Sequence, residues 1–256
     1  MNTKLWMKVV LAIMVLVLLP VAIVAAAGKV NMAQKSGVAQ NGVPANLPSR
    51  GPSATPFVFP NNPPDAAKAV LPQPNMPLSW KESWEFAWPN GSWLTWDNNG
   101  TDYGNENYDQ CWNDVSYRDS KGNWSGWPAA GCSDGYPAPG YSPNMDSWMT
   151  LGPVSTSGAK SAKLTYKYFL HTEMNFDWLG VCASVDNFNY YCSWRSGSTA
   201  GKFLKGTFDL KNVPGYGSML NQPYVWVGYI FQSDNSISGD YGYEGAYIDE
   251  FALAIK

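Results

Sequence analysis

Alternation of apolar and polar residues with a period of two predicts strands along most of the C-terminal two thirds of the chain. The clearest run spans residues 162–171, where every second side chain is apolar and Lys163, Thr165 and Lys167 stand between them. Such alternation turns one face of a strand towards a core and the other towards solvent. Similar runs are separated by Gly, Pro, Asn and Asp, with no convincing amphipathic helix among them. The pattern predicts an all-β fold, an antiparallel β-sandwich.

The remaining strands are predicted from shorter runs of the same kind, at residues 80–88, 93–97, 147–151, 179–185, 189–194, 202–210, 224–232 and 245–255. Residues 224–232 are apolar on both faces, which is typical of a central strand covered on both sides. Residues 80–88 place Trp84, Phe86 and Trp88 on one face of a predicted strand.

The last predicted strand carries an acidic residue on its core face. Read with a period of two, Asp249 shares that face with four apolar residues, Tyr247, Phe251, Leu253 and Ile255. An ionised carboxylate among apolar side chains is costly unless it is paired or bound to a metal ion. A calcium ion held by oxygen ligands meets this need. The alternative is that Asp249 lies at the rim of the sheet and accepts hydrogen bonds from backbone amides or water.

Two of the four cysteines are predicted to bridge neighbouring strands. Residues 179–185 and 189–194 fold as a hairpin about Asn187, which places Cys182 directly opposite Cys192. Directly opposed residues have Cβ atoms close enough for a disulfide.

The other two cysteines, Cys111 and Cys132, then pair by elimination. Their bridge closes part of residues 103–145, a long irregular stretch that we expect to be functional or tied down. Free buried thiols and a zinc site are the alternatives. Zinc is disfavoured, because the chain has no C-x-x-C motif and a single histidine, His171.

The N-terminal third does not have a globular pattern. Residues 1–27 have the layout of a secretory signal peptide, in which lysines precede an apolar run and alanines at 25–27 offer a cleavage site. An uncleaved membrane anchor is the alternative. Residues 28–77 are rich in proline and are expected to form a largely disordered spacer. The folded domain then spans residues 78–256 and is expected to be secreted.

Charge and motif content argue against several classes of function. The net charge of -3 gives no electrostatic footprint for nucleic acid and no polybasic membrane anchor. The single histidine, His171, excludes a two-histidine metalloprotease helix and has no flanking triad signature. Glutamates for glycoside hydrolysis are present, but no pair stands out. We therefore do not expect an enzyme.

Aromatic residues are the strongest remaining functional signal. They make up 15% of the chain, with 13 Trp and 15 Tyr. Flat aromatic rings offer apolar platforms on which sugar rings can stack. The candidates for ligand binding lie in the irregular stretch and are Trp112, Trp124, Trp127, Tyr136 and Tyr141. The alternative is that these rings fill the core or pack within their loop.

Several motifs resemble the MAM-like and choice-of-anchor jelly-roll modules. The opening residues that carry the likeness are Trp84-Glu85, Trp88-Pro89 and Trp93, and the closing ones are Gly245-Ala246-Tyr247-Ile248-Asp249-Glu250-Phe251. The likeness covers nearly all of residues 80–256 through the order and spacing of its motifs. It implies a jelly-roll, galactose-binding-like domain of a secreted bacterial protein, of the kind found beside immune-inhibitor-A-like peptidases.

The resemblance also implies a site and a role. Such modules are non-catalytic and often hold a structural calcium, which implies that Glu85 near the first strand and Asp249 in the last strand bind one ion. The expected function is a secreted module that binds glycan or a cell-surface partner, serving a separate enzyme. A structural or adhesion protein of the cell exterior is the first alternative, and a β-sandwich polysaccharide hydrolase or lyase is the second.

Overall fold

The computed structural model describes part of the C-terminal unit of the chain. The chain divides into two compact units, Met1–Pro44 and Ala45–Lys256. The described residues all lie in the second unit and are 57–58, 78–86, 88, 93–97, 111–130, 139–236 and 242–256. The predicted signal peptide and nearly all of the proline-rich spacer lie outside them. Within the described ranges there is no helix of the length and apolar character needed to cross a membrane.

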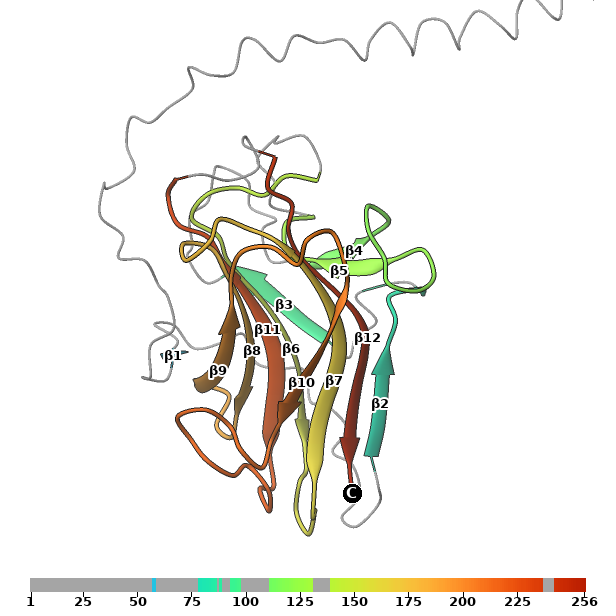
Figure 1. The fold of residues 1–256 in the computed structure, drawn as a ribbon. Helices are drawn as coiled ribbons and strands as arrows, with labels where there is room; N and C mark the ends of the chain where they lie inside the picture. The colour runs from blue at the N-terminus through green and yellow to red at the C-terminus, as the bar shows by residue number, and fades with distance from the viewer. Residues whose placement is uncertain are drawn as a thin grey trace, which may run out of the picture. The chain divides into compact units, whose positions relative to one another are not determined.

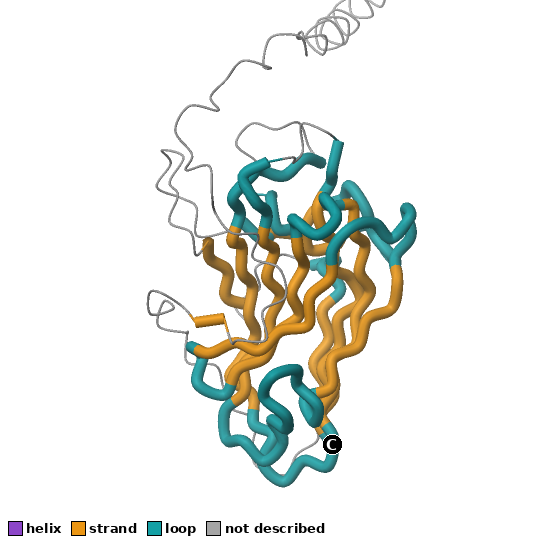
Figure 2. The backbone as a smooth tube through the Cα atoms, turned by 60° about the vertical axis from the view of Figure 1, so that its left-hand side comes forward, coloured by secondary structure: helices purple, strands orange, loops and turns teal. Residues whose placement is uncertain are grey.

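Two antiparallel sheets pack face to face as a sandwich (Figure 1 and Figure 2). The first sheet contains, in spatial order, β1 (Phe57–Val58), β9 (Asn189–Arg195), β8 (Trp178–Ser184), β11 (Val225–Gln232), β6 (Asp146–Val154) and β3 (Trp93–Asp97). The second contains β10 (Leu204–Asp209), β7 (Ala162–His171), β12 (Gly245–Ile255), β5 (Ser125–Trp127) and β4 (Asn113–Val115), while β2 (Leu78–Glu82) also pairs with β12. The predicted all-β antiparallel sandwich is confirmed.

Most predicted strands are present with nearly their predicted bounds. β3, β7 and β12 match the predicted ranges, and β11 is a central strand between β8 and β6, as its two apolar faces indicated. Three short strands, β1, β4 and β5, were not predicted. β1 lies within the proline-rich stretch expected to be a spacer, and β4 and β5 lie in the Gly-rich and Trp-rich stretch where apolar residues do not alternate.

The first predicted strand is shorter than its sequence pattern suggested. β2 ends at Glu82, whose Oε1 accepts hydrogen bonds from the backbone amides of Ser83 and Trp84 at 3.0 Å each. Trp84 then has a φ of 57°, which breaks the alternation. As a result Trp84 is buried and Phe86 is 84% exposed, so the prediction that both share one strand face is wrong.

Aromatic rings fill the space between the two sheets. Tyr229 of β11 lies at the centre, with its ring centroid 5.4 Å from that of Tyr166 on β7 and 6.2 Å from that of Phe251 on β12. Trp93 of β3 meets Phe251 edge-on at 5.1 Å. Edge-to-face contacts of this kind add to the burial of apolar area. The core therefore accounts for many of the aromatic residues in the sequence.

The closing strand β12 changes face at a bulge. Asp249 lies opposite Lys167 of β7 and Ala252 lies opposite Thr165, so β12 holds one extra residue in between. Glu250 adopts a left-handed conformation there, with a φ of 48°. A bulge of this kind shifts the alternation by one residue.

The bulge turns Asp249 away from the core between the sheets. Before it, Tyr247 lies opposite Phe169 of β7 and Asp249 opposite Lys167, on the outward face of the second sheet. After it, Phe251 and Leu253 point into the core. The prediction that Asp249 shares a face with Phe251, Leu253 and Ile255 is therefore wrong, because period-two counting does not include the extra residue.

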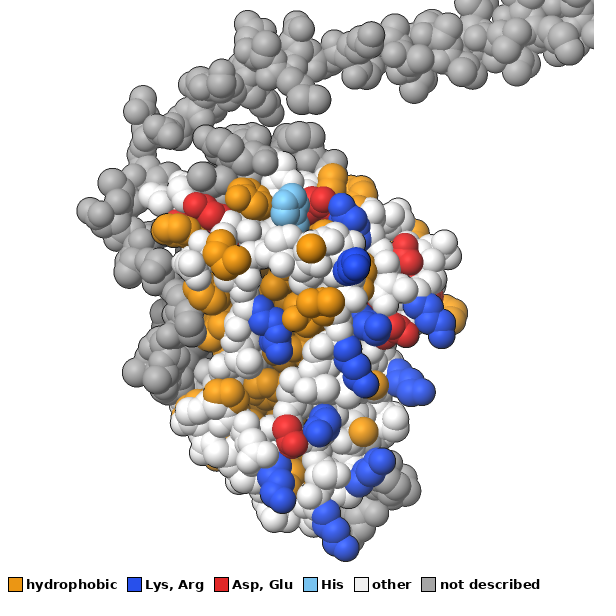
Figure 3. Space-filling view, viewed as in Figure 1, with side chains coloured by type: hydrophobic (Ala, Val, Ile, Leu, Met, Phe, Trp, Pro, Cys, Tyr) orange, Lys and Arg blue, Asp and Glu red, His pale blue; other side chains and the backbone are white. Residues whose placement is uncertain are grey.

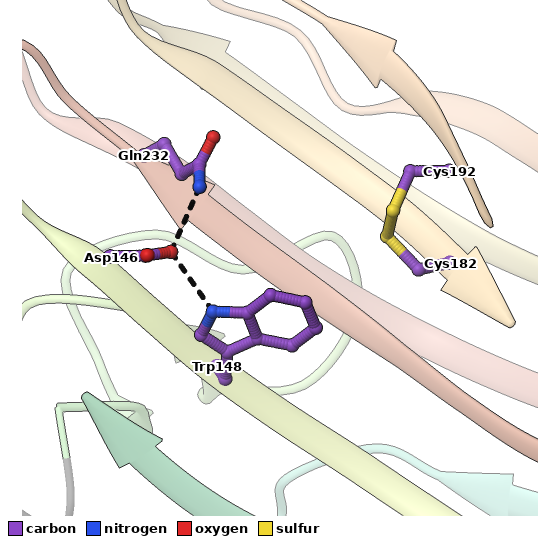
Figure 4. The surroundings of a disulfide bond; sticks show 5 residues. All are labelled: Asp146, Trp148, Cys182, Cys192 and Gln232. Carbon is purple, nitrogen blue, oxygen red and sulfur yellow. Dashed lines mark hydrogen bonds between the residues drawn. A yellow bond between two sulfur atoms is a disulfide. The ribbon is translucent and has the colours of Figure 1, made fainter. Parts of the chain in front are cut away.

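The predicted cross-strand disulfide is confirmed. Cys182 of β8 lies directly opposite Cys192 of β9, and the two are bonded with a Cα–Cα distance of 4.0 Å (Figure 4). Cys111 is also disulfide-bonded. Cys132, its predicted partner, lies outside the described residues.

The disulfide belongs to a second, smaller apolar cluster on the outward face of the first sheet. Trp148 and Ile230 are fully buried in this cluster. Asp146 Oδ1 accepts hydrogen bonds from Trp148 Nε1 and Gln232 Nε2, at 2.9 Å each, beside the cluster (Figure 4). Since its central side chains are covered, we interpret this face as a second packing layer.

Candidate functional site

The β4–β5 loop (residues 116–124) is held by a buried carboxylate of the last strand. Asp249 Oδ2 accepts hydrogen bonds from the backbone amides of Ser120 at 2.8 Å and Lys121 at 3.1 Å. Its Oδ1 accepts the amide of Glu250 at 2.6 Å. Asp249 has no exposed surface. The bulge of β12 thus aims this carboxylate at the backbone of the loop.

A second carboxylate binds the same loop, and it comes from near the start of the domain's sequence, whereas Asp249 comes from near its end. Glu85 Oε1 accepts the backbone amides of Asn123 at 2.9 Å and Trp124 at 3.0 Å. Gly122 lies directly against this carboxylate with a φ of 106°, and a Cβ there would collide with Glu85. Consecutive backbone N–H groups that converge in this way form an anion-binding nest. The loop is therefore tied to the segment after β2 as well as to β12.

Side-chain contacts complete the attachment of the loop. The Ser120 hydroxyl hydrogen-bonds Glu250 Oε2 at 3.0 Å. Arg118 donates to both carboxylate oxygens of Glu244, and its guanidinium lies 4.4 Å from the ring centroid of Phe169. The Glu244 carboxylate raises the pKa of Arg118. Charge-assisted, two-point contacts of this kind fix geometry better than single neutral bonds do.

Glu85 and Asp249 therefore converge on one element, although their described partners are amides. Burial raises the pKa of Asp249, while the amides of Ser120, Glu250 and Lys121 act in the opposite direction. A cation shared by these two side chains would have to lie among the backbone N–H groups that already donate to the same carboxylate oxygens. Because the positive ends of N–H dipoles repel a cation, the arrangement does not fit a shared ion. In the described part of the chain, no group of three or more His, Cys, Asp or Glu is placed to hold a metal ion. Calcium at this pair therefore stays a prediction of the sequence alone, which these contacts do not support and which chelation tests.

Three of the five predicted ligand-binding aromatics are buried. Trp112 and Tyr141 have no exposed surface, and Trp127 is 2% exposed. Trp112 Nε1 donates to the Ser147 carbonyl at 3.1 Å, and Tyr141 donates to the Asp177 carboxylate. Such rings fill the domain interior and offer no face to a ligand, so we correct the prediction for these three. Tyr136 lies outside the described residues.

Trp124 differs from the other predicted aromatics because its side chain is 39% exposed. It lies at the end of the β4–β5 loop, where its own backbone amide is bound by Glu85. Phe86, which follows Glu85, is 84% exposed. The exposed rings of Trp124 and Phe86 therefore lie in one corner of the domain, where carboxylates hold the loop backbone. Sequence reasoning missed Phe86, because its spacing placed it on one strand face with Trp84.

The carboxyl groups of Asp114 and Glu82 interact electrostatically within the described part of the domain. Burial raises the pKa of Asp114 on β4, its own backbone amide lowers it, and the charge of Glu82 on β2 raises it further. Glu82 is 8% exposed and already accepts two backbone amides. The hydrolase alternative can therefore be tested by substituting Glu82 of this pair.

Comparisons with known proteins find likeness of shape only. No protein-family model matches the chain, and no curated protein matches it. Among solved structures, it is similar to the K1 cleaved adhesin domain of Lys-gingipain from Porphyromonas gingivalis W83, with 18% identity, a TM-score of 0.44, and coverage of 69% of this chain and 97% of that one. It is also similar to the CBM22-1 xylan-binding domain of Paenibacillus barcinonensis Xyn10C, with 10% identity, a TM-score of 0.39, and coverage of 69% and 92%.

A third similar structure is TmCBM61 in complex with β-1,4-galactotriose, with 9% identity, a TM-score of 0.36, and coverage of 64% of this chain and 88% of that one. At these identities and scores, function has to be argued from the chain's own residues.

Proposed function

We propose that this protein is a secreted, non-catalytic β-sandwich module that binds glycan on a cell surface or in a polysaccharide matrix. The binding site is the corner formed by the β4–β5 loop and the segment that follows β2. Trp124 and Phe86 supply the apolar ring faces, and the loop backbone is fixed by Glu85 and Asp249. The signal-like residues 1–27 and the proline-rich spacer support a place outside the cytoplasm.

One observation carries the proposal. Trp124 is 39% exposed although its loop is held by four backbone amide hydrogen bonds to carboxylates, two to Asp249 and two to Glu85. Rigid presentation of an exposed ring lowers the entropy lost on binding. Trp is also among the residues most often found as binding hot spots.

Retention of the full chain on immobilised polysaccharides tests the proposal. We expect Trp124→Ala to weaken binding on the order of 30-fold, since truncation of a hot-spot ring costs about 2 kcal/mol. Tyr224→Ala is the matched control, because Tyr224 is 45% exposed and precedes β11, outside the proposed site. Equal retention of wild type and the Trp124 variant on every glycan that binds would refute the proposed site.

The hydrolase alternative has a separate test on the same protein. Turnover of any polysaccharide that disappears in Glu82→Gln, while binding persists, would favour catalysis by the Glu82 and Asp114 pair. We expect no turnover, because Glu82 Oε1 is engaged by the Ser83 and Trp84 amides.

A further inference from the structure

Lysine side chains project from the outward face of the second sheet. Lys163 and Lys167 alternate with inward residues along β7, and Lys205 of β10 lies directly opposite Lys167. Lys81 of β2 lies opposite Ala252 of β12, so it is two strands away from β7 on the side opposite to Lys205. We call these four residues the lysine face. Figure 3, seen from this side, shows Lys and Arg side chains spread over it with few acidic ones between them.

The positive charges of the lysine face are poorly balanced by the described fold. Among the described residues, Lys163 alone of the four has a salt bridge, to Asp209 at 3.6 Å. Lys167 and Lys205 are like charges directly opposite each other on neighbouring strands, an arrangement that is destabilising. Asp249, next to Lys167 on the other side, is buried and engaged by loop amides. A negatively charged ligand would relieve this repulsion.

The outward side chains between the lysines are small. The outward positions there are Ser79, Thr165, Thr207, Ala252 and Ala254. Hydroxyl and methyl groups of this size leave room for an extended polymer to lie on the strands. They do not form the apolar patch that a membrane would require.

The lysine face adjoins the proposed glycan site. Asp249, which binds the β4–β5 loop, lies directly opposite Lys167. Lys163 and Lys167 lie four residues apart, or about 13 Å along β7, and β7 and β2 are separated by about 10 Å across the sheet. A chain bound at Trp124 that continues over β12 therefore meets positive charges over a length of several sugar units.

We propose that the glycan bound by this module is an anionic polysaccharide, whose carboxylate or sulfate groups lie on the lysine face while a sugar ring stacks at Trp124. The inference rests on the proposed function for the position of the site and adds the charge of the ligand. Single-stranded nucleic acid stacks successive bases on a series of exposed rings. Beyond Trp124 and Phe86, the described β7 strand adds no such ring, because its outward aromatic residue Phe169 is 2% exposed and lies under Arg118.

The experiment compares two triple variants of the full chain with equal changes in net charge. The first is Lys81→Gln, Lys167→Gln and Lys205→Gln, whose side chains form no salt bridge among the described residues. The control is Lys160→Gln, Lys211→Gln and Lys256→Gln, all exposed and located in turns or at the chain end next to β7, β10 and β12. The ligands are polygalacturonate, heparin and neutral xylan, with single-stranded DNA and phosphatidylserine vesicles as competitors.

We expect the wild-type chain to bind polygalacturonate or heparin more tightly than xylan, and the preference to fade between ~50 mM and ~500 mM salt. A lysine near an anionic surface contributes about fivefold in affinity, so the first triple variant should bind on the order of 100-fold more weakly. The control triple variant should retain most of the binding. The ratio of the affinities for polygalacturonate and heparin then identifies the preferred anionic group.

Several results would overturn the inference. Equal loss in both triple variants would mean non-specific attraction, and equal or tighter binding of xylan would mean a neutral ligand. Tighter binding of DNA or vesicles would mean a different partner. The Trp124→Ala variant separates failure of the proposed function from failure of the charge inference. If this variant binds every polysaccharide as the wild type does, the proposed function fails. If Trp124→Ala loses binding but the first lysine triple variant does not, only the charge inference is overturned.

Discussion

Replacement of Asp249 by asparagine should destabilise the domain through the backbone of the β4–β5 loop. The carboxylate accepts amides from Ser120 and Lys121 on one oxygen and from Glu250 on the other. Asparagine keeps one acceptor oxygen and places an NH₂ group where the other stood. Either the Glu250 amide or the Ser120 and Lys121 amides would then face a donor. The side chain is fully buried, so water cannot replace the lost acceptor.

The magnitude follows from the amides left without a partner. A buried donor that loses its acceptor costs about 1–3 kcal/mol, and one or two donors are affected. Burial of the charged carboxylate already opposes folding, as its raised pKa indicates, and its removal offsets part of the loss. We therefore expect the free energy of unfolding to fall by about 3 kcal/mol and the Tm to fall by roughly 6–12 °C.

Urea and thermal unfolding, followed by circular dichroism, measure the effect. Asp119→Asn is the matched control, since Asp119 is an exposed residue of the same loop. The control should change the free energy of unfolding by less than about 0.5 kcal/mol. If Asp249→Asn were as stable as Asp119→Asn, the carboxylate would not be holding the loop and the reasoning would be refuted.

Three further outcomes are expected. Gly122→Ala should destabilise more than Gly201→Ala, because both have a positive φ but only Gly122 lies against a carboxylate; equal losses in urea unfolding would contradict this. Asp177 has its pKa raised by burial to about 7, so its protonation stabilises the fold at low pH and that contribution is lost as pH rises from about 4 through 7. Asp177→Asn should reduce the fall in Tm between about pH 4 and about pH 7, and an unchanged dependence of Tm on pH would contradict the raised pKa of Asp177. EDTA should leave the Tm unchanged, because amides occupy the carboxylates of Glu85 and Asp249; a Tm that drops in EDTA and recovers with calcium would restore the metal hypothesis.

Alternation along the sequence was sufficient to predict the longer strands, because one buried face imposes a period of two. It placed β7 and β12 correctly and fixed the hairpin register that pairs Cys182 with Cys192. It failed at Glu250 and Trp84, where residues other than glycine adopt a left-handed conformation. Local hydrogen bonds accompany these conformations, since Glu82 Oε1 accepts the Trp84 amide and Asp249 Oδ1 accepts the Glu250 amide, and a period count does not include them.

The candidate site was predictable only in part. The convergence of Glu85 and Asp249 followed from the resemblance, but their shared target, the backbone of one loop, required the fold. Trp124 was identified from sequence together with Trp112 and Trp127, which are buried. Composition could not separate these rings, because a core and a binding platform need the same residue type. The net charge of -3 likewise concealed the lysine face, since a sum does not report where charges lie.

Hydrogen exchange at the amides of Ser120, Lys121, Asn123 and Trp124 tests most directly whether two distant carboxylates hold this loop. We predict that all four amides exchange slowly in the wild-type chain, and that Asp249→Asn accelerates Ser120 and Lys121 more than the pair bound by Glu85. Rapid exchange at all four positions in the wild-type chain, at the rate of an unprotected surface turn, would contradict the account.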